Sequence, residues 1–527
     1  MATAVRQALG EAGLPDAEPT FERPRQREHG DWSTNVALAL AKRAGVPPRQ
    51  VAQRLVAKLP ALHGIIAVEV AGPGFVNFRL SHDVLEQVVR DAASRGQMWG
   101  RYVPERSPGR IQVEFVSANP TGPLHIGAGR WAAVGDAMAN LFELTGWGVS
   151  REYYFNDAGE QMERFGASVQ SALEGRPPPD DGYRGGYIQE LAEEILAAGE
   201  TDDLAEAAYQ RMLHRIEATL ARFRVHFDSY FGERTLHESG AIRRVIDRLV
   251  QEGHAYELDG ALWLRTTAFG DDKDRVLRRS DGRTTYFAAD CAYMANKLER
   301  GFDRCIYLLG ADHHGYVGRL KAIALAEGLD VERIEIIIGQ LVNFLRGGKA
   351  VRMSKRSGEF VTLDDLINEV GTDAARYTFL RTSIDVTLDF DLAEVVKADR
   401  ENPVYYVQYS SARIAGIMRK ATERGVEPGT VDDARLELLT HESEAELIRR
   451  IAAYPETVRY AAAERAPHKI ARYAEELAEA FHRFYTECQV VSDDGELTVA
   501  RYWLCMATRR TLVNALGILG VSAPDRM

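Results

Sequence analysis

Several features that would narrow the class of this protein are scarce or missing. The 527 residues include only four cysteines and no C-x-x-C pair, so we expect neither a zinc site nor a disulfide framework. We interpret Cys291, Cys305, Cys488 and Cys505 as buried thiols. No run of about eighteen apolar residues occurs, which argues against a membrane span. The first residues lack the basic and apolar regions of a secretory signal, so the cytoplasm is the expected compartment.

An excess of positive charge is also missing. The net charge is -12, and an overall negative field opposes indiscriminate binding of nucleic acid, although it leaves room for a local basic surface. The apolar content of 45% and the charged content of 27% are typical of a globular protein. A chain of this length predicts about three domains.

Residues 1–105 have the pattern of a small α+β domain. Helical periodicity follows Ser33 and Thr34, either of which could cap the helix, and a second short helix is expected over 47–60. Residues 65–80 form two strand-like runs separated by Gly72-Pro-Gly74, which predicts a hairpin.

From about residue 106 strands alternate with helices. The runs 110–116, 305–310 and 334–339 are apolar on both faces, as in buried parallel strands, and a helical pattern covers 130–146. This predicts a doubly wound α/β domain of the Rossmann type over 106–395, with ligands at the carboxyl ends of its strands. The segment 155–280 is too long for a loop and is expected to be an insertion. Residues 396–527 show helical periods and almost no strand signal, which predicts a helical bundle.

A loop that leads from a strand into a helix carries the first candidate site. Its sequence, NPTGPLHIGAGR over 119–130, places His125 and Gly127 where helix amides and the positive end of the helix dipole would face a ligand. A phosphate would suit this position. A plain structural turn with a packed histidine is the alternative.

A second glycine-flanked loop carries three cations. In VRMSKRSGEF, over 351–360, Arg352, Lys355 and Arg356 would suit a clamp for a polyphosphate, and a solvated basic turn is the alternative. Thr362 and Asp365 have the spacing of a capping box, which predicts a helix start directly after the loop.

Together the two loops resemble the HIGH and KMSKS signatures of class I aminoacyl-tRNA synthetases. The blocks VEFVSANPTGPLHIG, REYYFNDAGEQ, ALWLRTTAFGDDKDRVL, LLGADHHGYVGRLKA, MSKRSGEFVTLDDL and NPVYYVQYSSAR, in this order, resemble the bacterial arginyl-tRNA synthetases over nearly the whole chain. The resemblance implies activation of arginine by ATP, with Mg2+, followed by transfer to the tRNA for arginine. It also implies a monomer, an N-terminal domain that touches the tRNA, and a C-terminal anticodon-binding domain.

The resemblance assigns roles to residues of both loops. His125 and Lys355 are the expected catalytic residues, because charge stabilisation and positioning accelerate attack on the α-phosphate. The residues expected to contact ATP are His125, Gly127, Ala128, Arg130, Met353, Ser354 and Lys355. The family signature usually has a second histidine at the place of Ala128, so one phosphate contact is expected to be missing.

Recognition of arginine requires carboxylates, because a guanidinium is a planar fork of donors that keeps its charge. By resemblance the amino-acid pocket comprises Glu114, Ser117, Asn119, Tyr286, Asp290, His313 and His314. Glu114 stands in an otherwise apolar strand, and a bound cation would give it a partner. Asp290 could instead cap a helix that begins at Cys291, and Tyr286 could be a core aromatic.

Adjacent His313 and His314 also raise the possibility of a metal. Neighbouring histidines point apart on a regular element and no third ligand is evident, so we assign Asp312, His313 and His314 to substrate or nucleotide contacts.

Residues near the start of the helical bundle are candidates for tRNA binding. Tyr405, Tyr406 and Tyr409 with Arg413 could stack bases and hold phosphates, although tyrosines at helical spacing are often core residues. Two alternatives for the whole protein remain. One is a synthetase-like protein without activity, which Ala128 favours. The other is a class I synthetase for an amino acid such as cysteine, which zinc-binding thiols would favour.

Overall fold

The computed structural model describes the chain except residues 23, 25–28, 314 and 352–361. The chain divides into two compact units, each built from three segments. The first comprises Met1–Gly96, Gly416–Ala453 and Ala480–Arg510, and the second comprises Gln97–Ala415, Tyr454–Glu479 and Thr511–Met527.

The N-terminal part of the first unit has the predicted α+β character. An antiparallel sheet of order β1-β3-β2 is covered by apolar residues of the first three helices. The elements are α1 (Ala2–Glu11), β1 (Trp32–Thr34), α2 (Val36–Ala44), α3 (Pro48–Val56), β2 (Ile65–Ala71), β3 (Phe75–Leu80) and α4 (His82–Ser94). The predicted hairpin is confirmed, and Gly72 has a φ of 51° in its turn. The predicted cap is wrong, because Ser33 and Thr34 lie in β1 and Asn35 precedes α2.

A five-stranded parallel sheet forms the centre of the second unit. Its order is β11-β10-β4-β5-β6, with β4 in the middle. The strands are β4 (Arg110–Glu114), β5 (Gly148–Phe155), β6 (Ser229–Gly232), β10 (Arg304–Gly310) and β11 (Ile334–Gly339). Four residues of β4 are buried, as its run of apolar residues predicts for a strand covered on both faces.

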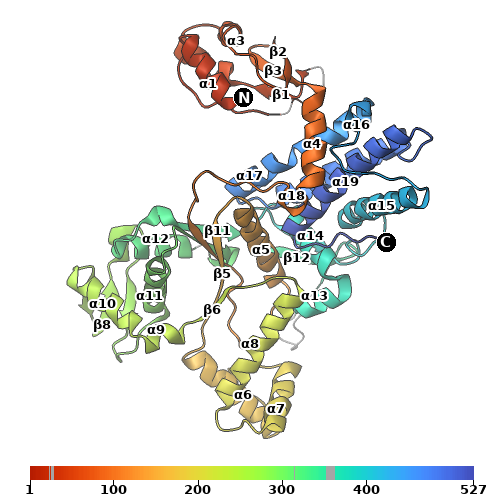
Figure 1. Ribbon diagram of the computed structural model, residues 1–527. Helices are drawn as coiled ribbons and strands as arrows, with labels where there is room; N and C mark the ends of the chain where they lie inside the picture. The colour runs from red at the N-terminus through yellow and green to blue at the C-terminus, as the bar shows by residue number, and fades with distance from the viewer. Residues whose placement is uncertain (23, 25–28, 314, 352–361) are drawn as a thin grey trace. The chain divides into compact units, whose positions relative to one another are not determined.

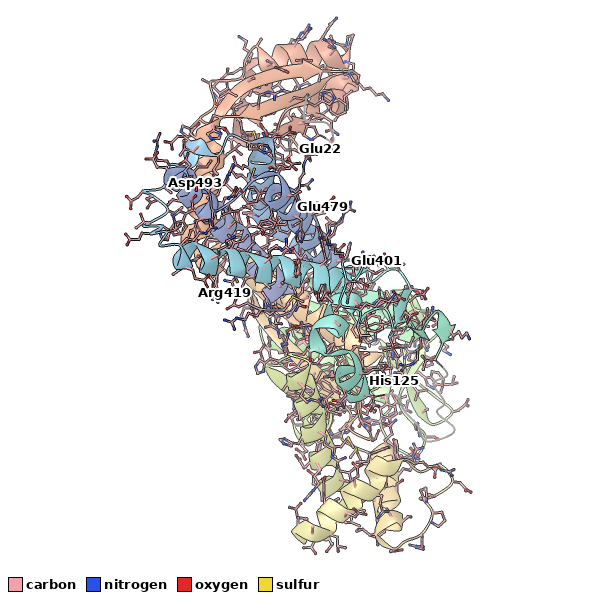
Figure 2. The ribbon with its side chains drawn as sticks, turned by 90° about the vertical axis from the view of Figure 1, so that its right-hand side faces the viewer. Glu22, His125, Glu401, Arg419, Glu479 and Asp493 are labelled. Atoms are coloured by element: carbon pink, nitrogen blue, oxygen red, sulfur yellow. The ribbon has the colours of Figure 1, made fainter. Side chains whose placement is uncertain are left out.

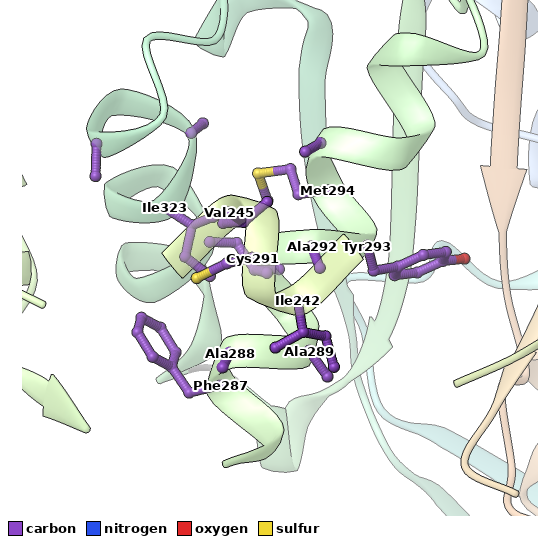
Figure 3. Packing of buried hydrophobic residues seen from close by; sticks show 14 of the residues in the cluster. Ile242, Val245, Phe287, Ala288, Ala289, Cys291, Ala292, Tyr293, Met294 and Ile323 are labelled. Atoms are coloured by element: carbon purple, nitrogen blue, oxygen red, sulfur yellow. The ribbon is translucent and has the colours of Figure 1, made fainter. Parts of the chain in front are cut away.

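Helices lie on both sides of this sheet, which confirms the doubly wound fold. Figure 1 shows α5 (Ala128–Leu144) on one side and α11 (Tyr286–Glu299) and α12 (Tyr316–Ala326) on the other. A hydrophobic cluster joins α11 and α12 to α10 (Ala241–Gln251), and Figure 3 shows Cys291, Met294 and Ile323 within it. In the same view Tyr293 points away from these residues, and its hydroxyl donates to Glu152 on β5.

The segment 155–280, expected to be an insertion, contains a strand of the main sheet. β6 pairs with β5 at the edge of that sheet. The predicted insertion is therefore not one continuous segment outside the sheet. On either side of β6 lie α6 (Glu160–Leu173), α7 (Gly186–Ala198) and α8 (Leu204–Arg222), then α9 (Arg234–Glu238), α10 and an antiparallel sheet of β7 (Ala255–Leu258), β8 (Ala261–Leu264) and β9 (Arg275–Arg278).

Residues 396–527 are helical without a strand, as predicted. A small sheet of order β13-β12-β14 and two helices precede them: β12 (Val342–Arg346), β13 (Lys349–Ala350), α13 (Leu363–Val370), α14 (Thr372–Arg381) and β14 (Leu388–Asp391). The C-terminal helices are α15 (Pro403–Glu423), α16 (Glu442–Ala452), α17 (Tyr454–Ala463), α18 (His468–Glu487) and α19 (Gly495–Ile518). Within the described residues, no helix combines the length and low charge needed to span a bilayer.

Candidate active site

A pocket of about 600 Å³ opens at the carboxyl ends of β4 and β10, the edge where a doubly wound sheet places its ligands. Its walls come from the turn after β4, the start of α5, the face of α11 and the segment after β10. Of the predicted site residues it is lined by Glu114, Ser117, His125, Gly127, Ala128, Asp290 and His313. The first signature loop, α11 and the end of β10 therefore meet at one cavity.

The first signature loop reaches this pocket just before α5. His125 Nδ1 accepts a hydrogen bond from the Gly127 amide at 3.1 Å, and the Ala128 amide donates to the His125 carbonyl at 2.8 Å. The sequence predicted that these amides would be free to donate to a ligand, but both donate to His125 instead. The positive end of the α5 dipole still points at the pocket, and α5 is long enough for that field to favour a phosphate.

The residues that follow the second signature loop are bonded to the first signature loop beside His125. The Leu363 amide donates to the Leu124 carbonyl at 2.8 Å, and His125 and Thr362 form a bridge of the β type. Figure 2 shows His125 next to the helix that follows, α13. The predicted capping box of Thr362 and Asp365 is confirmed. Met353, Ser354 and Lys355 lie outside the described residues, but the chain that leaves their loop is fixed to the first signature.

Glu114 has a protein partner, which corrects the expectation that substrate supplies one. Its Oε2 forms an ion pair with the ammonium of Lys297 on α11, whose side chain is 1% exposed. Its Oε1 accepts a hydrogen bond from Ser117 at 3.1 Å. A carboxylate compensated in this way does not require a guanidinium. Glu114 and Ser117 therefore form the wall of the pocket, and the direct recognition of arginine predicted for them is not supported.

Two other carboxylates fit that task better. Asp290 lies on α11 at the pocket, and Glu233, which follows β6, is 5% exposed and accepts from the Tyr154 hydroxyl at 2.6 Å. Burial and the neighbouring Glu233 charge raise the pKa of Asp290 to about 7, against the opposing effect of Arg319. Burial also raises the pKa of Glu233. A bound cation would stabilise both charges.

The alternative roles for Asp290 and Tyr286 are both wrong. Thr285 caps α11 and accepts from the Ala288 amide at 3.4 Å, so Asp290 lies inside the helix rather than at its start. Tyr286 is 55% exposed and is therefore not a core aromatic. It lines a second cavity of about 310 Å³ together with Glu233 and His237. Because Tyr286 and Asp290 are four residues apart on α11, they share one helix face.

Two predicted ligands have other partners. The Arg130 guanidinium, which was expected to contact ATP, is fully buried and donates to the carbonyls of Gln340, Leu341, Ser383 and Val386 at 2.7–3.3 Å. It thus anchors α5 to the segments around β12 and β14.

Asn119 is the other. Its side chain donates to Gln161 at 2.6 Å and accepts from the Asn156 amide at 3.0 Å. These bonds attach the first signature loop to the residues after β5. Neither Asn119 nor Arg130 lines the pocket.

Of Asp312, His313 and His314, only the side chain of His313 lies within the part of the chain that the structure describes. His313 ends a short 3-10 helix (Ala311–His313), lines the pocket and packs edge-on against Tyr316 with ring centroids 5.2 Å apart. His314 and the side chain of Asp312 lie outside what the structure describes. Among the described residues, no group of three potential ligands is placed to hold a metal ion.

Comparisons with known proteins match each part of the chain. Residues 1–80 match the family of the arginyl tRNA synthetase N terminal domain, 96–176 and 188–416 that of the class I (R) tRNA synthetase catalytic domain, and 407–527 that of the DALR anticodon binding domain. An arginine–tRNA ligase of Frankia alni is 49% identical, covering 99% of this chain and 98% of its own. The chain belongs to the arginyl-tRNA synthetases.

Solved structures of the family agree with the fold of this synthetase. A putative arginyl-tRNA synthetase from Campylobacter jejuni is 34% identical with a TM-score of 0.78, covering 85% of this chain and all of its own. The Thermus thermophilus arginyl-tRNA synthetase has a TM-score of 0.80 at 24% identity, covering 100% and 99%. The comparison at the lower identity bears on the fold alone.

Sequence reasoning missed Glu233 and Lys297. Glu233 directly follows the short aromatic run of β6, whereas Glu114 was noticed because it stands inside the apolar run of β4. It was overlooked because the run fell within the predicted insertion. Lys297 carries no local signal, since its position in α11 is as compatible with a solvated lysine as with a buried one.

Proposed function

We propose that the protein binds arginine through Asp290, which lines the pocket, and Glu233, which lines the second cavity and is bonded to Tyr154 of the pocket wall, and that it binds ATP beside His125 and the start of α5. As a member of its family the protein is a class I arginine–tRNA ligase, which forms arginyl-adenylate and transfers the arginyl group to tRNA. The raised pKa of Asp290 next to buried Glu233 supports the arginine site, because a pair of carboxylates at close quarters favours a bound cation. Tyr286 and His313 would bound the substrate on either side.

The chemistry requires little more than position and charge. The arginine carboxylate attacks the α-phosphorus of ATP, the bond to the bridging oxygen breaks, and pyrophosphate leaves with the electron pair. We assign the phosphate contacts to His125 and to Lys355 with Met353 and Ser354, while Gly127 and Ala128 line the pocket beside them and allow close approach of the nucleotide. Lys355 would stabilise the charge on the departing pyrophosphate. His125 would hold the phosphates near the positive end of α5.

Mg2+ would enter as part of the ATP complex, since the described residues provide no set of three ligands for an ion of their own. We propose that the enzyme acts as a monomer in the cytoplasm and that the tRNA for arginine is its partner.

For tRNA binding we propose the exposed side of α15. Tyr405 stacks on Tyr409 with ring centroids 6.0 Å apart, and the Arg413 guanidinium lies 4.7 Å from the Tyr409 ring. Figure 2 shows Arg419 further along the same helix, where it is exposed. A column of half-buried rings and cations can stack a base and hold phosphates. Tyr406, also half-buried, would support this column.

Arginine-dependent pyrophosphate exchange, measured with tRNA present, tests the arginine site. We expect Glu233→Gln and Asp290→Asn to raise the KM for arginine at least about thirtyfold, as for removal of one partner of a desolvated charge pair, with little change in the KM for ATP. Glu327→Gln is the matched control, because Glu327 is also a buried carboxylate of raised pKa but lies at the end of α12, outside the pocket.

Unchanged arginine affinity in both variants would refute the assignment to these carboxylates. Exchange with cysteine in place of arginine would favour the alternative substrate, and no exchange with any amino acid would favour the inactive alternative. Lys355→Ala should slow exchange on the order of a hundredfold or more without loss of arginine affinity.

A further inference from the structure

A buried lysine stands behind the wall of the active site. Lys297 lies on α11 with its side chain 1% exposed, and its ammonium pairs with Glu114 at the end of β4. The same ammonium lies 3.8 Å from the centroid of the Tyr307 ring and 4.5 Å from that of Tyr293. Both rings and Glu114 line the pocket. An amine buried this deeply needs a carboxylate and aromatic faces to compensate its lost hydration.

The pair is connected to a strained turn. Val116 and Ser117, which follow β4, have φ values of 69° and 44°, in the left-handed region that is costly for a β-branched residue above all. The Ser117 hydroxyl donates to Glu114 at 3.1 Å and accepts from the Tyr154 amide at 3.2 Å. The next residue, Ala118, is bonded twice to the Tyr153 hydroxyl. This hydroxyl accepts from the Ala118 amide at 3.2 Å and donates to the Ala118 carbonyl at 2.7 Å.

This turn forms part of the wall that faces the nucleotide loop. Val116, Ser117 and Ala118 line the same pocket as His125 and Gly127. Its conformation persists because side chains from β4 and β5 hold it, and Glu114, which is paired with Lys297, accepts one of these bonds.

We propose that Lys297 is a positioning residue for arginine activation: its ion pair compensates the charge of Glu114, so that Glu114 holds Ser117 and the turn in place and does not compete for the substrate guanidinium. The proposal rests on the assignment of arginine to Glu233 and Asp290, and it adds a residue that touches neither substrate. Without Lys297, Glu114 is an uncompensated anion at the pocket wall, which disturbs the Ser117 turn and competes for the substrate guanidinium. The reacting carboxylate of the substrate is then displaced.

The charge of Glu114 also reaches the substrate carboxylates. The charged and titratable groups that face Asp290 are Glu233 after β6, Arg319 on α12, and Glu114 on β4, with the Tyr154 hydroxyl bound to Glu233. Glu114 raises the pKa of Asp290, and the ammonium of Lys297 places a positive charge against Glu114. Loss of the ammonium should therefore move the ionisation of Asp290 to higher pH.

The test is a set of three variants measured by arginine-dependent pyrophosphate exchange from pH 6 to 9. Lys297→Met should lower kcat/KM for arginine on the order of a hundredfold, as for a small misplacement of reacting groups, and should shift the midpoint of the pH profile upward. The double variant Lys297→Met with Glu114→Gln has no uncompensated charge, and its glutamine oxygen can still accept from Ser117. It should recover at least about tenfold of the loss and return the midpoint toward that of the wild type.

Arg248→Met is the matched control. It also leaves a buried carboxylate, Glu327, without the guanidinium that contacts it at 2.7 Å, but the pair does not line the pocket. It should lower thermal stability without moving the pH midpoint. If Lys297→Met does not fold, the double variant is compared with Glu114→Gln alone, which leaves a buried ammonium unpaired and should be the less active of the two.

Two results would overturn the proposal: a Lys297→Met enzyme with the wild-type pH midpoint and wild-type kcat/KM, or a double variant no more active than the single ones. Both are independent of the arginine assignment. That assignment fails if Glu233→Gln and Asp290→Asn leave the KM for arginine unchanged, whatever the Lys297 variants do.

Discussion

Asp290 should make arginine activation depend on pH near neutrality. Its pKa is raised to about 7 by burial and by the charge of Glu233, whereas the guanidinium of arginine stays charged over the whole working range. Only the ionised carboxylate attracts this substrate. The ionised fraction of a group with that pKa rises from about one-eleventh at pH 6 to about ten-elevenths at pH 8. We therefore expect kcat/KM for arginine to rise about tenfold between these values.

The assay is pyrophosphate exchange at limiting arginine and saturating ATP and tRNA. Asp290→Asn should be slower at every pH and should lose the rise between pH 6 and 8. Glu327→Gln should retain it, which matters because burial raises the pKa of Glu327 to about 8, close to the same range. A wild-type profile that is flat from pH 6 to 8, or an Asp290→Asn profile as steep as that of the wild type, would refute the role of Asp290.

The same group makes a prediction for stability without substrate. Because the pKa of Asp290 is higher in the folded chain than its ordinary value of 3.8, the folded state binds the proton more tightly, and stability declines from about pH 4 until the group is ionised above pH 7. The side chain keeps some contact with solvent, which screens part of this effect, so we expect a loss of roughly 1–3 kcal/mol at pH 8. Asp290→Asn should abolish this loss of stability, and added arginine should restore the stability of the wild-type protein at pH 8.

Substitutions at three further residues test other parts of the structure. Arg130→Met and Arg130→Lys should each lower the free energy of unfolding by at least about 3 kcal/mol in denaturant titrations, because neither side chain can serve four carbonyls; a harmless lysine would contradict the anchor. Gln112 is fully buried in β4, and neither the nitrogen nor the oxygen of its side-chain amide has a hydrogen-bond partner among the described residues. Gln112→Leu should therefore raise the free energy of unfolding by about 1–3 kcal/mol. A loss of stability would show that the amide is satisfied. Arg413→Gln should raise the Kd for tRNA about tenfold in filter binding and leave the KM for arginine at saturating tRNA unchanged; unaltered tRNA affinity would return Arg413 to a structural role.

Local patterns predicted most of the elements and some of the site. The apolar runs at 110–116, 305–310 and 334–339 became neighbouring parallel strands, because residues buried on both faces leave a continuous apolar run in the sequence. The Thr362 capping box was equally predictable, since all of its atoms lie within three residues. For the same reason His125 and Gly127 could be placed at the start of a helix at the ligand edge of the sheet.

Partners far apart in the chain were not predictable. The sequence predicted that Glu114 binds a cationic substrate, but in the structure Glu114 pairs with Lys297 on α11, 183 residues later. It also predicted that Arg130 contacts phosphate, but its guanidinium donates to carbonyls more than 200 residues away.

The sequence by itself determined which segments are strands and helices and where the nucleotide loops begin, because periodicity and capping are local properties of the chain. The tertiary structure alone decided which carboxylates remain for arginine. Packing brings β6 beside β5 and α11 beside β4, and this compensates the charge of Glu114 and gathers Glu233 and Asp290. The sign and number of charges at a site depend on such neighbours, and these are fixed only when the core has formed.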